Sequence, residues 1–294
     1  MNPKPTGLLV CMPTRGAVSI ETMLCLRHHL DGYPCKLLTA IRKPVEIGRN
    51  ALAKAALEFD AERLPFAPKY CLWVDDDAWW PAGHVAKAVS ILETHSEVDA
   101  VSGVFCARKA WHPAHGILKV PAAPTLDEFP ESVIAEFPDE VEHLHAADRF
   151  RYHPERYEDG ELVPLRIGAL HWNLMRRSLL EAVGSDPFTP MEKPLDFPSG
   201  LYPGKGDLMP EDFSFYTRAN NSGRQIVIER SLLVGHVEIG NDRMYFPNSA
   251  PRFAKGLAVP QRIDTTELSG MPRRHHTLEG GEDVWKDGLR GASA

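Results

Sequence analysis

The chain of 294 residues has no long apolar run, and no stretch approaches the roughly 18 apolar residues that a helix needs to cross a bilayer. Its opening segment, Met1 to Pro5, lacks the charged and then apolar pattern of a secretory leader. We therefore expect a cytoplasmic protein that does not insert into membranes. With 43% hydrophobic and 25% charged residues, the chain still suffices for a large core, which excludes disordered and collagen-like classes.

Cysteine is scarce and shows no metal-binding or disulfide pattern. The five cysteines are odd in number and include no C-x-x-C pair. Three of them, Cys11, Cys71 and Cys106, lie inside apolar runs, where a thiol behaves as a small buried hydrophobe. We expect free thiols in a reducing compartment.

Positive charge is in deficit. The formal net charge of −7 argues against a protein that binds polyanions over its whole surface, although a local basic patch is compatible with it. Residues 127–142 hold seven acidic side chains and no Lys or Arg, which indicates a solvated surface insertion.

The segment Gly204 to Gly206 lacks the spacing of a phosphate-binding loop, and no internal repeat is visible.

The apolar pattern alternates between short continuous runs and helical periodicity. The runs predict strands at 7–12, 37–41, 70–74, 99–105, 167–174, 225–228 and 231–234. The periodic segments predict helices after Ser19 and over 46–59, 83–95, 177–183 and 211–222. For the first two helices the spacing predicts buried faces at Ile20, Met23 and Leu24 and at Ile47, Ala51 and Ala55. This alternation predicts an α/β fold: a mainly parallel, twisted sheet flanked by helices.

Three consecutive aspartates, Asp75 to Asp77, follow the apolar run 70–74 directly. Like charges this close resist joint ionisation, and a divalent cation is the simplest compensation. Hard cations such as Mg²⁺ or Mn²⁺ take carboxylate oxygens together with water and phosphates. The alternative is that these acids cap the next helix or face solvent. The site would lie where open α/β sheets bind ligands, beyond the carboxyl ends of the strands.

Residues 70–77 (YCLWVDDD) resemble the D-x-D segment of nucleotide-sugar-dependent glycosyltransferases with the GT-A fold, family 2 among them. Three further stretches agree with that family in order along the chain. They are the strand and Pro-Thr turn at 10–15, the Arg-Asn helix at 47–52, and the E-D-x-x-F-x-x-R-x-x-x-x-G pattern from Glu211 with Gly235-His236 after it. The resemblance covers 7–106 and 167–237. It implies a sheet with a Rossmann-like nucleotide-binding half and an acceptor-binding half.

The resemblance also implies a metal and nucleotide site. Asp77 is the first candidate for a metal ligand and His236 would add a nitrogen, although a histidine after an apolar strand is more often a core or surface residue. Asp75 would bind the metal, one of its waters or the ribose, while Asp76 is less certain because an extended chain points it to the opposite face. The remaining candidates for the nucleotide side are Pro13, Thr14, Arg15, Arg49 and Asn50. The two arginines offer paired donors to phosphate or the nucleobase, and the asparagine would contact the base or tie loops together.

The acceptor side follows from the same resemblance. Asp212 would be the general base that deprotonates the acceptor hydroxyl, and Glu211 would hold the acceptor; in a retaining reaction both would position the substrates. Their alternative role is to stabilise a helix N-terminus. Trp172 and Asn173 correspond to the acceptor-side wall, with core packing as an equal alternative.

These observations together predict a catalytic domain over 1–250, interrupted by an irregular acidic insertion at 107–165, and an extension at 251–294. The predicted function is metal-dependent transfer of a sugar from a UDP- or GDP-sugar, with Mn²⁺ or Mg²⁺, to an acceptor hydroxyl. The acceptor is open: a saccharide, a small metabolite or a modified nucleic acid. Two rival hypotheses are a nucleotidyltransferase acting on sugar phosphates and a non-catalytic protein that binds sugars or nucleotides.

Overall fold

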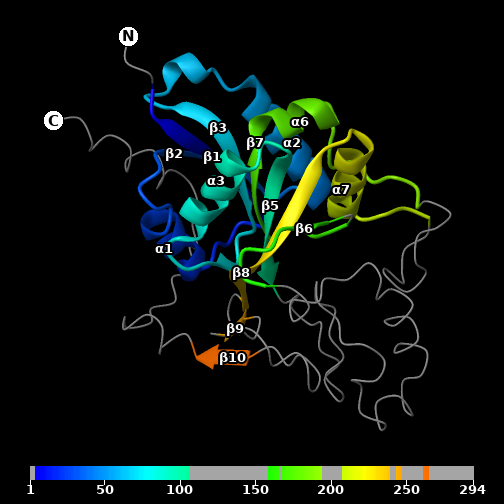
Figure 1. Ribbon diagram of the computed structural model, residues 1–294. Helices are drawn as coiled ribbons and strands as arrows, with labels where there is room; N and C mark the ends of the chain where they lie inside the picture. Colours follow the sequence, from blue (N-terminus) through cyan, green and yellow to red (C-terminus); the bar gives the residue numbers. More distant parts are fainter. Residues whose placement is uncertain are drawn as a thin grey trace, which may run out of the picture. The chain divides into compact units, whose positions relative to one another are not determined.

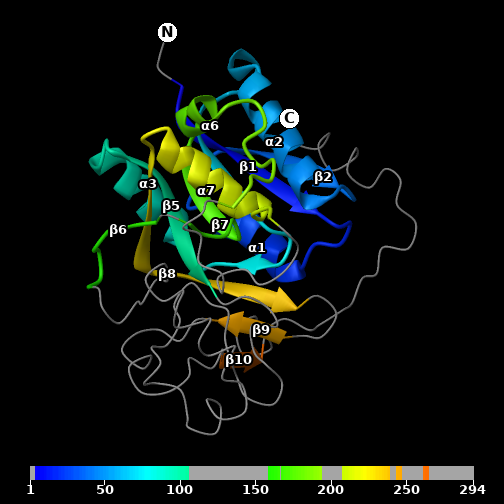
Figure 2. The same ribbon diagram turned by 90° about the vertical axis from the view of Figure 1, so that its right-hand side faces the viewer.

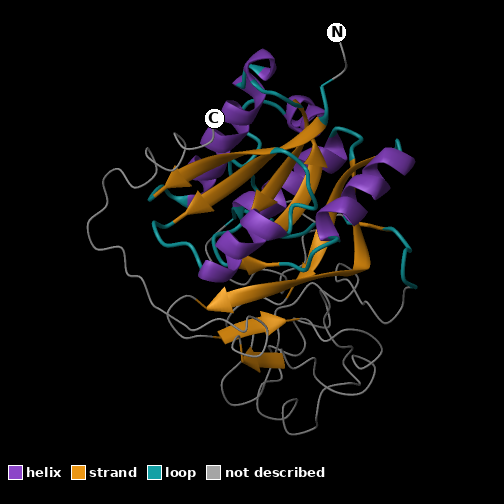
Figure 3. Cartoon of the chain, turned by 90° about the vertical axis from the view of Figure 1, so that its left-hand side faces the viewer, coloured by secondary structure: helices purple, strands orange, loops and turns teal. Residues whose placement is uncertain are grey.

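A mixed β-sheet with helices on both faces forms the centre of the chain (Figures 1 and 3). This computed structural model describes residues 4–105, 158–165, 167–193, 207–238, 243–246 and 261–264. The predictions for the acidic stretch 127–142 and for Cys106 lie outside these residues, as does most of the extension expected at 251–294.

The strands follow the order β10-β9-β8-β5-β7-β3-β1-β2, and β4 and β6 also pair with β8. Their bounds are β1 (Thr6–Thr14), β2 (Cys35–Ile41), β3 (Ala67–Val74), β4 (Ala78–Trp79), β5 (Val98–Phe105), β6 (Val163–Pro164), β7 (Trp172–Arg176), β8 (Gln225–Glu238), β9 (Arg243–Phe246) and β10 (Gln261–Asp264). The pairs β1 with β2, β1 with β3 and β5 with β8 are parallel, whereas β7 lies antiparallel between β3 and β5. Five long strands therefore run in one direction, which confirms the predicted α/β class and its mainly parallel sheet.

The helices cover the two faces of this sheet in separate groups. They are α1 (Ile20–His28), α2 (Val45–Glu58), α3 (His84–Thr94), α6 (Arg177–Val183) and α7 (Glu211–Asn221), with a short 3₁₀ turn at Ala61–Arg63. Alternate residues of β1 separate the groups: Leu8 and Val10 pack with α1 and α3, whereas Leu9 and Cys11 pack with α2, α6 and α7. Because both faces are covered, the central strands are buried over most of their length, as their continuous apolar runs predict.

The first helix begins where the sequence predicts but buries a different face. Ser19 is the N-cap, and its side chain accepts a hydrogen bond from the Thr22 amide. Ile20 is 61% exposed, whereas Thr22 and Cys25 are buried. Thr22 faces inward because its hydroxyl donates a hydrogen bond to the Ala78 carbonyl at 2.7 Å.

The second helix, α2, also turns away from its predicted face. Ile47 is 53% exposed and Ala55 is exposed, while Gly48 and Arg49 are buried. Gly48 packs on β2, where a Cβ would meet the Ala40 methyl at 3.4 Å, an ordinary van der Waals contact. The smallest residue and a charged one therefore occupy the inner face, and apolar periodicity alone cannot indicate that.

Two strand predictions need correction. The strand expected at 167–174 begins only at Trp172, and the preceding stretch is irregular. The strands expected at 225–228 and 231–234 are one long strand, β8, which continues to Glu238 (Figure 2). The strand continues through the polar residues between the two predicted strands. Glu229 can be fully buried there because Lys87 and Ser231 bind its carboxylate.

The thiol predictions hold in part. Cys11, Cys25 and Cys71 are free and buried, whereas Cys35, at the start of β2, is free and exposed. Within the described residues, no helix is both long and apolar enough to cross a membrane.

Candidate active site

A cavity of about 690 Å³ opens at the carboxyl ends of the parallel strands. The ends of β1, β3 and β5 contribute Thr14, Asp75 and Phe105 to its lining, and the first turn of α7 contributes Glu211 and Asp212. This is the edge at which an open α/β sheet binds ligands. The aspartate triplet, the α7 acids and His236 thus meet in one place.

Backbone hydrogen bonds fix the aspartate triplet. The Asp75 amide donates to the His171 carbonyl at 3.1 Å, and the Val237 amide donates to the Asp77 carbonyl at 2.7 Å. Directly after the triplet, β4 pairs with β8 so that Ala78 lies opposite His236. The chain therefore holds Asp77 between two histidine-bearing segments.

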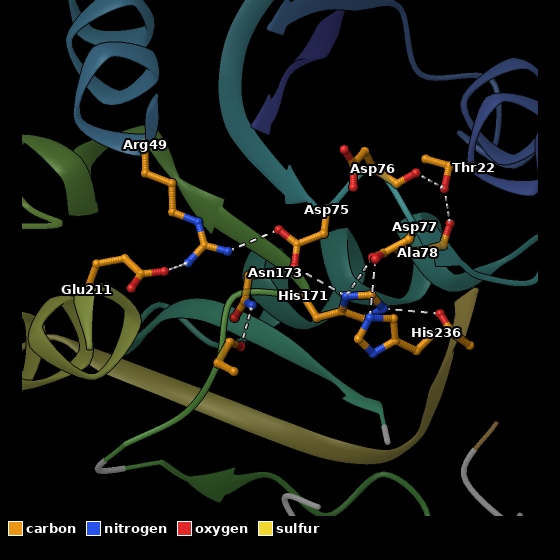
Figure 4. A network of polar contacts seen from close by, with 12 residues as sticks. Thr22, Arg49, Asp75, Asp76, Asp77, Ala78, His171, Asn173, Glu211 and His236 are labelled. Carbon is orange, nitrogen blue, oxygen red and sulfur yellow. Dashed lines mark hydrogen bonds and ion pairs between the residues drawn. The ribbon is translucent and has the colours of Figure 1, made fainter. Parts of the chain in front are cut away.

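Asp77, His171 and His236 form a group that could hold a metal ion (Figure 4). One ligand atom from each lies within 4.8 Å of the others. Asp77 Oδ2 is 3.3 Å from His236 Nε2, and Asp77 Oδ1 is 3.7 Å from His171 Nδ1. The aspartate is 2% exposed, so its charge is removed from water and requires compensation.

The hydrogen bonding of His171 calls for positive charge beside its Nδ1 atom, either a proton or a bound cation. Its Nε2 lies 3.1 Å from the Gly235 carbonyl, which can only accept, so Nε2 carries the proton and donates. Nδ1 then faces two carboxylates, Asp75 at 3.3 Å and Asp77 at 3.7 Å. A lone pair aimed at two carboxylates is repulsive unless Nδ1 is protonated or a cation lies between them. Burial opposes charge on this imidazole, but the two aspartates outweigh burial and raise the pKa of His171.

This donor set fits a divalent metal. One carboxylate and two imidazoles suit Mn²⁺, Fe²⁺, Co²⁺ or Zn²⁺ better than Mg²⁺, which prefers oxygen. Sequence reasoning did not identify His171. It lies in an irregular stretch just before β7, and only the antiparallel insertion of β7 between β3 and β5 brings it to the triplet.

Asp75 takes part in a different arrangement from Asp77. Arg49 Nη2 donates to Asp75 Oδ1 at 3.0 Å, and Arg49 Nη1 donates to Glu211 Oε1 at 2.8 Å. Burial alone would raise the pKa of Asp75. Arg49 and His171 have a larger, opposite effect and lower this pKa to about 2. Burial likewise disfavours the charged form of Arg49, and Asp75, Glu211 and Asp212 together raise its pKa. Arg49, predicted to bind phosphate or base, is thus held by two carboxylates.

Asp212 has the opposite electrostatic situation from Asp75. Burial and the neighbouring charge of Glu211 raise the pKa of Asp212 to about 7, against the lowering effect of Arg49. Its Oδ1 accepts a hydrogen bond from the Phe213 amide at 2.8 Å. A carboxyl group that titrates near neutral pH is suited to general acid or base catalysis.

The nucleotide-side candidates line the cavity near the end of β1. Asp76 Oδ2 accepts a hydrogen bond from the Arg15 amide at 3.1 Å, and burial raises the pKa of Asp76. Pro13, Thr14 and Arg15 line the cavity, as does Lys43 from the loop before α2. Arg15 and Lys43 are exposed cations at the edge of an acidic cavity.

Three of the predicted site residues do not line the cavity. The Asn50 side chain binds Thr189 and the Phe188 amide, so it ties loops together. Trp172 is fully buried against Trp80, in the core. Asn173 is 1% exposed and accepts a hydrogen bond from the Tyr216 hydroxyl. Asn50 therefore has the contacts of the loop-tying alternative, and Trp172 and Asn173 have those of the core-packing alternative.

The cavity carries an excess of negative charge. Among the described residues that line it, the acidic and basic side chains, counted at their formal charges, are five carboxylates and three cations: Asp75, Asp76, Asp77, Glu211 and Asp212, with Arg15, Lys43 and Arg49. With its histidines neutral, the cavity therefore has two more formal negative charges than positive ones. An added cation would be attracted to it.

Comparisons with known proteins add little. No family model matches the sequence, and no curated protein matches it. The crystal structure of A197 from STIV is similar over 92% of this chain and 99% of its own, with 13% sequence identity and a TM-score of 0.46. A likeness this distant carries no functional argument. The chain is an α/β protein with a mixed, mainly parallel sheet flanked by helices, and this class rests on its own strand order.

Proposed function

We propose that the chain is a metal-dependent glycosyltransferase that moves a sugar from a UDP- or GDP-sugar to an acceptor hydroxyl. One observation carries the proposal: the Asp77, His171 and His236 group and the titratable carboxyl of Asp212 line the same cavity. This reaction requires a site for a metal ion and a side chain that can accept a proton near neutral pH.

The metal group would consist of Asp77, His171 and His236. A divalent cation bound there would neutralise the diphosphate leaving group. His171 would ligate through Nδ1, since its Nε2 donates to the Gly235 carbonyl. The Gly235 carbonyl, which accepts from Nε2, would orient the imidazole, and Asp75, which lies 3.3 Å from Nδ1, is held in place by Arg49.

The donor's nucleotide would lie against the end of β1. Pro13, Thr14 and Arg15 form that side of the cavity, and Arg15 and Lys43 would bind the diphosphate oxygens as exposed cations. Asp76, predicted as a nucleotide contact, lies there as well. These cations offset part of the repulsion between a diphosphate and the carboxylates behind it.

Asp212 would act on the acceptor. Its Oδ1 is occupied by the Phe213 amide, and we assign Oδ2 to the acceptor hydroxyl. As the new bond forms between the acceptor oxygen and the anomeric carbon, the bond from that carbon to the diphosphate breaks, and the hydroxyl proton passes to Asp212. Glu211, fixed by Arg49, would help to position the acceptor.

The test uses water as the acceptor. The chain is incubated with Mn²⁺ and each of a panel of UDP- and GDP-sugars, and release of nucleoside diphosphate is measured by chromatography. We expect Mn²⁺-dependent release from at least one donor, loss of release in Asp77→Ala, and normal release in Asp60→Ala, a surface control. Release of pyrophosphate from a nucleoside triphosphate and a sugar phosphate would instead indicate a nucleotidyltransferase. Binding without turnover of any donor would indicate a binding protein.

A further inference from the structure

Arg49 connects two acidic segments that are far apart in the sequence (Figure 4). It is 4% exposed, and its two terminal nitrogens donate to Asp75 at 3.0 Å and to Glu211 at 2.8 Å. In Figure 4 the Arg49 and Glu211 pair lies on one side of Asp75, and the two imidazoles lie on the other. The guanidinium is therefore an inner part of the cavity wall.

Glu211 and Asp212 are adjacent in the sequence, but their carboxyl groups have different hydrogen-bond donors. Arg49 Nη1 donates to the carboxylate of Glu211, a charged pair. The hydrogen bond at Asp212 comes from the Phe213 amide, a neutral donor of the same helical turn. Two neighbouring carboxyl groups resist joint ionisation, and a hydrogen bond from a guanidinium favours the charged form of the one that accepts it.

We infer that Arg49 is a positioning residue that gives the two acids of α7 different roles. It fixes the Glu211 carboxylate by a direct hydrogen bond, and it leaves Asp212, which is bound by the Phe213 amide, as the carboxyl group that exchanges a proton. The base role of Asp212 belongs to the proposed function, on which this part of the inference rests. The division between the two acids is a property of the chain alone and can be measured without any substrate.

The electrostatics of the cavity support this division. Burial and the charge of Glu211 raise the pKa of Asp212 to about 7, and Arg49 opposes them. The titratable and charged groups that interact electrostatically with Asp212 are Glu211 and Tyr216 on its own helix, Arg49 on α2, and Asp75 after β3. The other charged or titratable groups that line the cavity are Arg15, Lys43, Asp76, Asp77, His171 and His236.

Removal of Arg49 and removal of the Glu211 charge have opposite consequences. In Arg49→Met the cation that favours ionisation is gone, so the pKa of Asp212 rises. In Glu211→Gln the like charge is gone, so the pKa of Asp212 falls. Charges this close shift a pKa by about one unit or more. Two shifts of opposite sign would show that Arg49 and Glu211 act on Asp212 through their opposite charges.

The experiment is a ¹³C NMR titration of the side-chain carboxyl groups, with Asp and Glu labelled, in the full chain without sugar nucleotide. Asp212→Asn identifies the Asp212 signal, and Glu211→Gln identifies that of Glu211. We expect the wild-type Asp212 signal to titrate near neutral pH. The Asp212 midpoint should move up in Arg49→Met and down in Glu211→Gln.

Arg218→Met is the matched control. Arg218 lies on the same helix and donates to the carbonyls of Pro187 and Thr189, away from the acids, so its removal should leave the Asp212 midpoint unchanged. If Arg49→Met does not fold, Glu211→Gln and Arg49→Lys still test the inference. Lysine keeps the positive charge but lacks the paired donors of the guanidinium. We therefore expect Glu211 to be held less tightly in Arg49→Lys, and the Asp212 midpoint to move less than in Arg49→Met.

Three results would overturn the inference: Glu211 rather than Asp212 titrating near neutral pH in the wild type, an Asp212 midpoint in the ordinary carboxyl range, or the same midpoint in all folded variants. The proposed transfer reaction can fail while the titration succeeds, since no donor is present. Where transfer is detected, the inflection of its pH–rate profile should move in the same directions as the Asp212 midpoint.

Discussion

His236 Nε2 lies 3.3 Å from Asp77 Oδ2, and backbone pairing rather than side-chain attraction brings the two residues together. Ala78 pairs with His236 across β4 and β8, and the Val237 amide donates to the Asp77 carbonyl. The site is therefore organised by its strands before any ligand arrives, which reduces the reorganisation that metal binding requires.

Replacement of His171 by alanine should weaken metal binding. The imidazole supplies one of the three donor atoms of the group, and loss of even an outer contact to a metal site costs about 10-fold to 100-fold in affinity. We expect at least a tenfold rise in the Mn²⁺ dissociation constant, measured by isothermal titration calorimetry. His95→Ala, a surface substitution, should bind Mn²⁺ like the wild type. Equal affinity of both variants would exclude His171 from the site.

Replacement of Arg49 by methionine should destabilise the chain. The change leaves Asp75 and Glu211, which are 29% and 17% exposed, without their common cation, and we expect a loss of up to about 3 kcal/mol, the lower end for a fully buried pair. Urea denaturation measures the free energy of unfolding. Lys54→Met removes an exposed helical ion pair with Glu58 and should change stability by less than about 0.5 kcal/mol. Similar values for the two variants would contradict the buried role of Arg49.

Asp212→Asn should change how stability depends on pH. The pKa of Asp212 is raised to about 7 in the folded chain, so between the ordinary carboxyl pKa and neutral pH the folded state binds more protons than the unfolded state. This contribution to wild-type stability is present at acid pH and is lost as pH rises toward 7. The wild type should therefore lose stability relative to the variant across that range.

Thermal unfolding of both proteins over a pH series gives the difference directly. Asp60→Asn, with a half-exposed carboxyl group beside Arg63, is the control and should not reproduce this trend. A gap between wild type and Asp212→Asn that is constant with pH would show that the carboxyl group titrates alike in both states.

The sequence predicts the long strands β1, β2, β3 and β5 and most helix bounds, because continuous apolar runs mark strands that helices cover on both faces. The short strands β4, β6, β9 and β10 are not predicted. The predicted end of α7 is confirmed by Gly223, which adopts a φ of +68° just past the helix. The buried faces of α1 and α2 are different, because Thr22 and Arg49 are turned inward by polar partners on other elements. Such partners are set by tertiary contacts and leave no periodic signal.

The candidate site could be predicted only as far as its residues follow motif-bearing strands. Asp75 to Asp77 and Glu211 to Asp212 were placed by a strand end and a helix start, and the structure brings both segments to one cavity. His171 could not be found in this way. Its position depends on β7 running antiparallel between two parallel strands, which no local pattern specifies. Trp172 and Asn173 follow it on β7 and lie in the core for the same reason.

Tyr216→Phe tests whether Asn173 has a structural role. The Tyr216 hydroxyl donates to Asn173 Oδ1 at 3.0 Å, and both side chains are almost completely buried. The variant leaves that amide oxygen without its donor, so we expect a loss of about 1–3 kcal/mol in the free energy of unfolding. Tyr33→Phe, at a partly exposed tyrosine, should cost much less. Mn²⁺ affinity should be unchanged in both variants, since neither tyrosine lines the cavity. If Tyr216→Phe weakened Mn²⁺ binding without loss of stability, this hydrogen bond would support the site rather than the core.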